Sequence, residues 1–332
     1  MMTLSDTHEI IFTHLQELQP FMEEPTVTEI NVNWDGSIYV ERQGQREVVS
    51  GVRITAKNYS FGIQQMAQAL KGTSLNAQKP RLHATLPDGS RVAIAIPPMS
   101  YGGITLTIRK HRGRAYSLPE LVDSGTLPPV VLAVLAPAIQ RAENPASIAI
   151  SGPTGSGKTT LLNGLLTLID PATRVGFIEE DAAEIKKEHF ADLFPFVTTE
   201  TIHVRALVKD ALRHTPERLI VGEVRGAEAI DMVDALNTGH PGSFTTLHAN
   251  SAEHALRRLR TFMLNAEGTT PQNYQAVGYQ IADAFQFVVH MGRVKLPHGE
   301  RKRAVTELIR VTGYHPEKDQ FLTETLYPLP VH

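Results

Sequence analysis

The stretch SGPTGSGKTT, residues 151–160, fits the pattern G-x-x-x-x-G-K-[ST] with Gly152, Gly157, Lys158 and Thr159 at its fixed positions. It follows the apolar run ASIAIS and precedes KTTLLNGLLTLI, whose leucines repeat along one face of a helix. A strand, a glycine-rich turn and a helix in this order form the context that supports such a match. Backbone N–H groups of the turn then converge on phosphate oxygens, where the helix dipole also favours anions. The stretch predicts a nucleoside triphosphate site rather than an ordinary glycine-rich turn.

Two side chains of this loop have expected roles of their own. Lys158 can reach the β- and γ-phosphates of ATP, and Thr159 can hold Mg²⁺ beside them. We therefore expect ATP and Mg²⁺ as ligands, with Thr159 as the metal-binding residue. The expected nucleotide-binding residues are Gly152, Pro153, Thr154, Gly155, Ser156, Gly157, Lys158, Thr159 and Thr160.

The sequence around the loop alternates between strand and helix patterns. Apolar runs of strand length are ASIAIS, RVGFIEE, RLIVGEV and SFTTLHA, and helical patterns occupy 129–142, the segment from Lys158, 204–213, 227–236 and 252–263. This alternation implies βαβ units and a mainly parallel sheet. Residues 129–332 are therefore predicted to form an α/β domain around the phosphate loop.

The N-terminal part has a different pattern. A helical pattern at 8–19 is followed by TEINVNWDGSIYVERQG, which alternates apolar and polar residues around Asp35-Gly36 as a hairpin does. A second helical pattern at 56–71 and further strand-like runs follow. Residues 1–115 are therefore predicted to be a small α+β domain with an antiparallel sheet. Residues 116–128, rich in turn formers, are predicted to be a linker.

Composition limits the functional classes. The chain has 332 residues, 42% hydrophobic and 20% charged, which is typical of a globular protein of two domains. Its 32 basic and 35 acidic residues give a net charge of -3, which argues against a surface devoted to nucleic acid. The absence of cysteine excludes disulfides and cysteine zinc sites, and it fits a reducing cytoplasm.

The sequence also bears on membranes. The N-terminus, MMTLSDTHEIIFTHL, lacks the basic and apolar regions of a signal peptide. The longest apolar run, PPVVLAVLAPAI at 128–139, is shorter than the roughly 20 residues of a spanning helix, and Pro137 interrupts it. We expect a cytoplasmic protein whose membrane association is peripheral.

Acidic residues follow two of the predicted strands. Glu223 ends RLIVGEV, and a carboxylate at the C-terminal end of a parallel strand beside the loop can polarise an attacking water or hold Mg²⁺ through one. The segment FIEEDAAEI, 177–185, contains Glu179, Glu180, Asp181 and Glu184. These acids either tune the water and the outer shell of the metal or simply begin a helix, where acids are favoured.

Two histidines frame the next strand, in NTGHPGSFTTLHANS at 237–251. A metal site normally needs three or four protein ligands, and spacing fixes no third partner for His240 and His248. Strand ends on this side of a parallel sheet face the nucleotide crevice. We predict that both imidazoles sense the γ-phosphate or its attacking water, with His248 the closer of the two. The alternative is a pair of structural histidines.

A dense basic cluster, RKHRGR at 109–114, ends the N-terminal domain. It is either solvated linker charge, a nucleic-acid patch or a source of arginines for the triphosphate. A nucleic-acid patch favours interleaved aromatic residues, and only Tyr116 is near.

Together these motifs resemble the secretion-ATPase superfamily of type II and type IV secretion. The likeness is greatest to conjugal-transfer and type IV secretion ATPases, strong over roughly 145–290 and weaker over 25–115. The most diagnostic run is GEVRG…NTGHPGS…TLHANS. RHTPER departs mildly from the family pattern, and the tetracysteine insert of some type II and pilus relatives is absent.

The resemblance implies a RecA-like C-terminal domain, a homo-hexameric ring and a place at the cytoplasmic face of the inner membrane, beside secretion or conjugation proteins. It implies that Glu223 is the Walker B glutamate and that Arg109 reaches nucleotide from the N-terminal domain. It assigns Glu180, Asp181 and Glu184 to an acidic box and His240 and His248 to a histidine box.

The predicted function is therefore an ATP-hydrolysing motor for conjugative DNA transfer, type IV secretion or pilus biogenesis, without direct sequence-specific nucleic-acid binding. A tight-adherence or type IV pilus motor is the alternative within the same class. A RecA-like nucleic-acid translocase and a small-molecule kinase are alternatives from other classes.

Overall fold

The computed structural model describes residues 13–42, 45–111, 116–180, 185–199, 201–266, 274–295 and 301–327. The chain forms two compact units, Met1–Gly113 and Arg114–His332. Within the described ranges, no helix combines the length and the apolar character that crossing a membrane requires.

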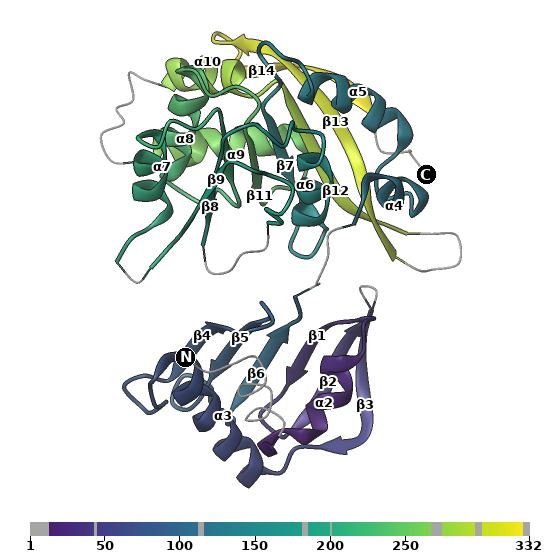
Figure 1. Cartoon of the computed structure of the whole chain (residues 1–332), viewed down its shortest axis with the longest axis vertical. Helices are drawn as coiled ribbons and strands as arrows, with labels where there is room; N and C mark the ends of the chain where they lie inside the picture. The colour runs from purple at the N-terminus through teal and green to yellow at the C-terminus, as the bar shows by residue number, and fades with distance from the viewer. Residues whose placement is uncertain are drawn as a thin grey trace. The chain divides into compact units, whose positions relative to one another are not determined.

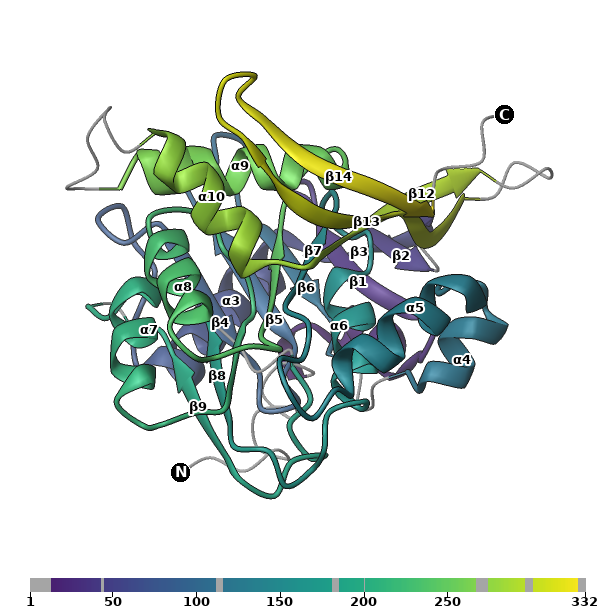
Figure 2. The same ribbon diagram turned by 90° about the horizontal axis from the view of Figure 1, so that it is seen from above.

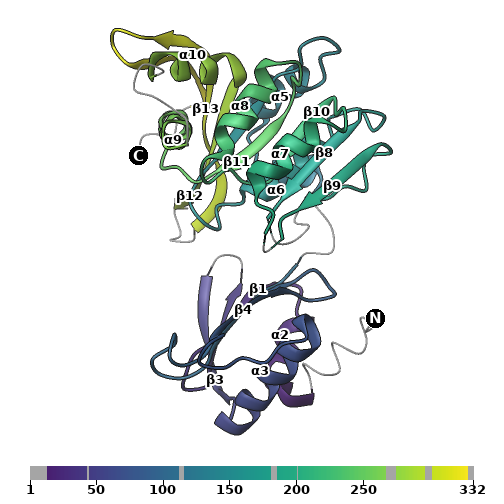
Figure 3. The same ribbon diagram turned by 90° about the vertical axis from the view of Figure 1, so that its left-hand side faces the viewer.

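The first unit is an antiparallel sheet covered by helices on one face (Figure 3). The strand order is β3-β2-β1-β6-β5-β4. The hydrophobic side chains of α3, among them Ile63 and Met66, are buried against alternate residues of the strands, such as Ile30 and Val40. The elements are η1 Gln16–Leu18, α2 Gln19–Glu23, β1 Val27–Val32, β2 Ser37–Arg42, β3 Gln45–Arg53, α3 Ala56–Lys71, β4 Arg81–Thr85, β5 Arg91–Ala95 and β6 Thr105–Arg109.

The predicted α+β character and antiparallel sheet of this unit are confirmed. The helix expected at 56–71 is present as α3. The helix expected at 8–19 begins outside the described residues, and helical structure continues beyond it to Glu23.

The segment expected to be a linker, 116–128, contains the helix α4, Leu118–Asp123. Ser117 and Glu120 form a reciprocal capping box that starts this helix, and Leu121 is buried against α6 of the second unit. The segment therefore belongs to the second unit, because its apolar side chains, Leu121 and Leu127 above all, are buried in the core of that unit.

The second unit is an eight-stranded sheet in the order β14-β13-β12-β7-β11-β10-β8-β9 (Figure 1). Neighbouring strands from β12 to β9 are parallel, whereas β13 and β14 are antiparallel additions. The elements are α5 Pro129–Ile139, β7 Ile148–Ser151, α6 Lys158–Leu166, β8 Val175–Glu179, β9 Leu193–Val197, α7 Val204–Leu212, β10 Arg218–Val221, α8 Glu228–Asn237, β11 Phe244–Leu247, α9 Ala252–Leu264, α10 Tyr274–Ala284, β12 Phe287–Lys295, β13 Arg301–His315 and β14 Gln320–Tyr327.

Helices cover both faces of this sheet (Figure 2). Helices α4 to α6 pack on one face together with Ile148 and Ile150, whereas α7 to α10 pack on the other face together with Ala149. The central strands are buried on both sides, so they read as continuous apolar runs rather than alternating ones. The predicted mainly parallel α/β domain is confirmed.

The strands β9 and β12 to β14 were not predicted from the sequence. The strand β12 lies beside β7 and parallel to it, so that His290 is the register partner of Ser151. A strand from the C-terminal part of the chain therefore lies beside Ser151, the residue after which the phosphate loop begins.

Candidate functional site

The phosphate loop joins β7 to α6 and packs closely on β12. A Cβ atom built on Gly152 would lie 2.4 Å from the Met291 carbonyl oxygen, so only glycine allows this approach. Gly157, at the N-cap of α6, has φ +95°, a left-handed conformation that glycine adopts at little cost. Gly152 thus allows the loop to approach β12, and Gly157 allows the backbone to turn into α6.

Lys158, the first residue of α6, is only 8% exposed. Its Nζ donates to the carbonyl oxygens of Gly152 at 3.0 Å and Pro153 at 3.2 Å. It also lies 3.3 Å from Nδ1 of His248. The ammonium group is therefore held over the loop mainly beside oxygen and nitrogen acceptors, where it can also reach a phosphate.

His248 follows β11 and lies between Lys158 and Glu223. Its Nδ1 is 3.2 Å from the Gly152 carbonyl oxygen, and its Nε2 is 3.0 Å from Oε1 of Glu223. The tautomer with Nε2–H accepts from Lys158 at Nδ1 and directs its N–H toward Glu223. The structure thus brings three of the predicted residues into one cluster at the C-terminal edge of the sheet.

One oxygen of this cluster has no aligned partner. Oε1 of Glu223 is buried, and although His248 Nε2 is 3.0 Å away, no hydrogen bond of good geometry reaches this oxygen from any residue that the structure describes. The other oxygen, Oε2, accepts from Arg225 at 2.8 Å. A buried carboxylate oxygen with an unsatisfied lone pair is a ready acceptor for a proton of a bound water.

The electrostatics keep the carboxylate charged and the imidazole neutral. Burial alone raises the pKa of Glu223, but the hydrogen bond and charge of Arg225, followed by the charges of His248 and Lys158, bring that pKa below its usual value. Burial and the neighbouring Lys158 lower the pKa of His248, against the opposing effect of Glu223. At neutral pH the cluster therefore contains an ionised Glu223 and an uncharged His248.

The acidic segment after β8 divides into two roles. Glu179 is 4% exposed, accepts from the Ile185 backbone N–H at 2.8 Å and pairs with Lys187, so it serves packing. Glu180 instead pairs with Arg225, the residue that also contacts Glu223. Asp181 and Glu184 lie outside the described residues.

His240 does not join the cluster within one protomer, which corrects the expectation that both histidines face the crevice. It precedes β11, whereas His248 follows it, so the four-residue strand separates them across the sheet. The Nδ1 atom of His240 lies 3.0 Å from the Ala235 carbonyl oxygen, at the end of α8. An extended strand advances about 3.3 Å per residue, so a strand with one histidine before it and one after it places the two rings at opposite edges of the sheet.

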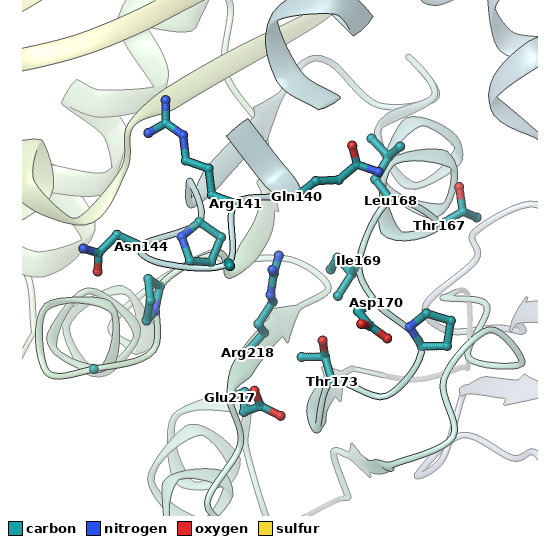
Figure 4. A pocket seen from close by; sticks show the side chains of 15 residues that line it. Gln140, Arg141, Asn144, Thr167, Leu168, Ile169, Asp170, Thr173, Glu217 and Arg218 are labelled. Carbon is teal, nitrogen blue, oxygen red and sulfur yellow. The ribbon is translucent and has the colours of Figure 1, made fainter. Parts of the chain in front are cut away.

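The surroundings of His240 lie at the N-terminal edge of the sheet. Its neighbours Gly239 and Pro241 line a cavity of about 830 Å³ there, together with Glu217 and Arg218 at the start of β10 (Figure 4). The phosphate loop contributes no residue to this cavity. It is a site distinct from the Lys158, Glu223 and His248 cluster.

Arg109 is the last residue of β6 in the first unit, and its side chain is exposed. That Arg109 reaches the nucleotide stays a prediction. Lys110 of the same cluster donates to the carbonyl oxygens of Phe21 and Glu24, and residues 112–114 lie outside the described residues.

Sequence reasoning missed three residues near the loop. Arg225, in GEVRG, joins Glu223 to Glu180, and its place directly after the strand-end glutamate was a usable signal. A Cβ atom on Gly155 would lie 3.1 Å from a guanidinium nitrogen of Arg293, on β12. His290 contacts Ser151. The last two come from a strand far along the chain, and no local pattern marks them.

A groove of about 790 Å³ opens beside the loop. It runs from Pro153 and Thr154 past His248 to the helix α9, where Arg257 and Arg258 line it. Cationic side chains next to a phosphate loop favour an anionic ligand such as a nucleotide.

A parallel α/β sheet with a glycine-rich loop, its lysine and a strand-end glutamate defines a P-loop nucleoside triphosphatase domain. The more particular assignment follows from comparison with known proteins. The profile of the type II/IV secretion system protein family matches residues 13–318, and the chain belongs to that family.

Curated relatives cover most of the chain. Conjugal transfer protein TrbB of Rhizobium radiobacter is 34% identical over 298 residues, which is 88% of this chain and 86% of the relative. Type IV secretion system protein PtlH of Bordetella pertussis is 32% identical over 321 residues, 88% of this chain and 93% of the relative.

Solved structures support the fold. The Legionella pneumophila ATPase DotB has a TM-score of 0.64 at 20% identity, covering 90% of this chain and 80% of that protein. The pilus retraction motor PilT with bound ADP has a TM-score of 0.64 at 19% identity, covering 88% and 81%. The predicted RecA-like domain with a smaller α+β domain before it agrees with these neighbours.

Proposed function

We propose that this protein is an ATP hydrolase that works as a ring-shaped motor for conjugative DNA transfer or type IV secretion. The observation that carries the catalytic part is the buried Oε1 of Glu223, unsatisfied among the described residues and 3.0 Å from His248. The transport part rests on family membership and on the names of the relatives.

The phosphate loop binds the triphosphate first. The backbone N–H groups of residues 154–160 would face the α- and β-phosphates, and Lys158 would turn its ammonium from the carbonyls of Gly152 and Pro153 to the β- and γ-phosphates. Thr159, the second residue of α6, supplies a hydroxyl ligand for Mg²⁺. When bound, Mg²⁺ neutralises charge on the β- and γ-phosphates. One hydroxyl and phosphate oxygens suit an ion that prefers oxygen and keeps several waters.

Glu223 then acts as the general base. A water in line with the γ-phosphorus forms the new P–O bond while the bond from that phosphorus to the β–γ bridging oxygen breaks, and the leaving ADP takes the electron pair. Oε1 of Glu223 accepts the proton of the water. Lys158 stabilises the charge on the transferred phosphoryl group. The products are ADP and inorganic phosphate.

His248 is proposed to sense the γ-phosphate. Its neutral ring already lies against Lys158 and Glu223, so Nε2–H can donate to the γ-phosphate or to the attacking water. Loss of phosphate removes that bond, and the turn that leads from His248 into α9 is then free to move. Arg109, Asp181 and Glu184 are proposed to complete the site as the family resemblance implies.

The His248→Ala protein should lose turnover more than ATP affinity. One lost hydrogen bond of about 1.4 kcal/mol in the transition state lowers kcat by about 10-fold, while the Kd for ATP changes little because the loop and Lys158 remain. Steady-state phosphate release and equilibrium titration with ATP separate the two. His240→Ala, at the opposite edge of the sheet, is the matched control for loss of an imidazole. An equal loss of turnover in both variants contradicts the assignment.

The pH dependence of turnover tests the same residue. The pKa of His248 in the folded protein is lowered from 6.5, so the ring is neutral above that value and becomes charged only as the pH falls through the lowered pKa. A charged ring beside Lys158 repels it, so we expect kcat to be flat above pH 7 and to fall in acid. The acidic limb should flatten in His248→Ala, and an unchanged limb assigns it to another group.

A ring also makes a prediction about assembly. If Arg109 of one subunit completes the site of a neighbour, sedimentation with a non-hydrolysed ATP analogue and Mg²⁺ should show a hexamer. In cells, we expect this hexamer at the cytoplasmic face of the inner membrane. Arg109→Ala should lower turnover without changing binding of the analogue. A monomer with full specific activity overturns the ring, since nothing would then require the interface.

A further inference from the structure

The buried histidine of β12 forms a contact that the proposed chemistry does not use. His290 is 5% exposed, and its Nδ1 lies 2.9 Å from Oγ of Ser151, which is completely buried. Ser151 Oγ also lies 3.3 Å from the Val289 carbonyl oxygen. Since Ser151 ends β7, this contact fixes the residue from which the phosphate loop departs.

The next residue of the loop is the one that gathers the catalytic side chains. The carbonyl oxygen of Gly152 accepts from Lys158 Nζ at 3.0 Å and lies 3.2 Å from His248 Nδ1. Gly152 is also the glycine whose missing side chain lets Met291, the neighbour of His290, approach the loop. A displacement of Ser151 therefore moves the carbonyl that holds Lys158, and Lys158 in turn lies 3.3 Å from His248 Nδ1.

A second contact leads from the same rung of the sheet to α9. Glu307 of β13 is the register partner of His290, and its Oε2 accepts from the Ala252 backbone N–H at 2.8 Å. This N–H belongs to the first turn of α9, a few residues after His248. His290 and Glu307 thus brace the two segments that carry Lys158 and His248.

The imidazole acts here as a neutral hydrogen-bonding group. Burial lowers the pKa of His290, and the charges of Lys158 on α6 and His254 on α9 lower it further, whereas Glu307 on β13 opposes them. An uncharged ring can bind the Ser151 hydroxyl without repelling Lys158.

We propose that His290 is a positioning residue for ATP hydrolysis, which sets the Gly152 carbonyl and through it Lys158 and His248 by its hydrogen bond to Ser151. This inference rests on the proposed ATPase activity. It assigns to the C-terminal strands β12 and β13 a direct part in the geometry of the catalytic site.

The test replaces His290 by two residues of opposite hydrogen-bonding capacity. The side-chain amide of His290→Asn lies near the place of Nδ1 and keeps a bond to Ser151, whereas His290→Leu has similar bulk and forms none. We expect kcat to fall about 10-fold in His290→Leu, the effect of one hydrogen bond, and to stay within about 3-fold of wild type in His290→Asn. Turnover is measured per folded protein, well below the melting temperature of each variant.

Ser151→Ala removes the same bond from the other side and carries the test if His290→Leu does not fold. It also removes the 3.3 Å contact to the Val289 carbonyl oxygen, so kcat should fall at least as far as in His290→Leu, and the double variant should be no worse than Ser151→Ala, because both changes remove the Ser151–His290 bond. His189→Leu is the matched control, since it removes a part-buried imidazole contact, 2.7 Å to the Ile169 carbonyl oxygen, away from the loop. It should lower stability and leave kcat unchanged.

Two results overturn the inference while leaving the ATPase proposal intact. One is wild-type kcat in folded His290→Leu or in Ser151→Ala. The other is an equal fall of kcat in His290→Asn and His290→Leu, together with a fall in the double variant that is the product of the two single falls. That result indicates general loosening of the core and not the loss of one hydrogen bond. Absence of ATP hydrolysis by the wild-type protein contradicts the proposed function itself.

Discussion

The Glu223→Gln protein should bind ATP nearly as well as the wild type and hydrolyse it at least about 100-fold more slowly, the usual scale for a general base. The amide has the shape of the carboxylate but cannot take a proton from water. Binding survives because Lys158 and the loop do not depend on this proton acceptor. Phosphate release under single-turnover conditions measures the chemical step, and titration with ATP measures affinity.

Glu223→Gln also removes the negative charge that pairs with Arg225, whose guanidinium donates to Oε2 of Glu223 at 2.8 Å. Glu180→Gln is the matched control, because Glu180 pairs with the same arginine. If proton transfer is the cause, Glu180→Gln should be the milder variant by at least about 10-fold. Near-normal phosphate release by Glu223→Gln moves the base to the acidic segment after β8.

Local signals explain what was predictable from the sequence. The phosphate loop is defined by residue types at fixed spacing, and its glycines meet requirements visible within ten residues. Glu223 could be placed because an apolar run of strand length ends directly before it, and parallel strands present that end to the loop. The antiparallel sheet of the first unit likewise follows from alternating runs and turn residues.

Contacts between distant segments explain what was not predictable. Ser151 and His290 are 139 residues apart in the sequence, and they meet because β12 pairs with β7 in the sheet. The helix α4 forms because Leu121 finds a buried place against α6, which composition does not reveal. The two histidines of the motif lie at opposite edges of the sheet, because the strand β11 runs between them and only its C-terminal end faces the loop.

The Lys158→Ala protein should lose both ATP binding and ATP hydrolysis, whereas Glu223→Gln loses only hydrolysis. Its Nζ lies on the phosphate loop, 3.0 Å from the Gly152 carbonyl oxygen and 3.3 Å from His248 Nδ1. A charge-assisted hydrogen bond is worth about 1.5–3 kcal/mol, so ATP affinity should fall by roughly 10- to 100-fold. Turnover should be undetectable even at saturating ATP, because the charge that stabilises the transferred phosphoryl group is gone.

Stability separates this loss from unfolding. Lys158 is buried and donates to the backbone carbonyls of Gly152 and Pro153, so removing it relieves the cost of burying a charge and should leave the folded protein intact. Lys209→Ala makes the same change in net charge on the exposed side of α7, where the lysine pairs with Asp231, and should keep wild-type turnover. Lys158→Arg keeps the charge but not the compact shape, and we expect it to resemble Lys158→Ala in turnover because the larger guanidinium does not fit between Gly152 and His248. If Lys158→Ala keeps turnover within 10-fold of wild type, the loop at 151–160 is not the catalytic phosphate site.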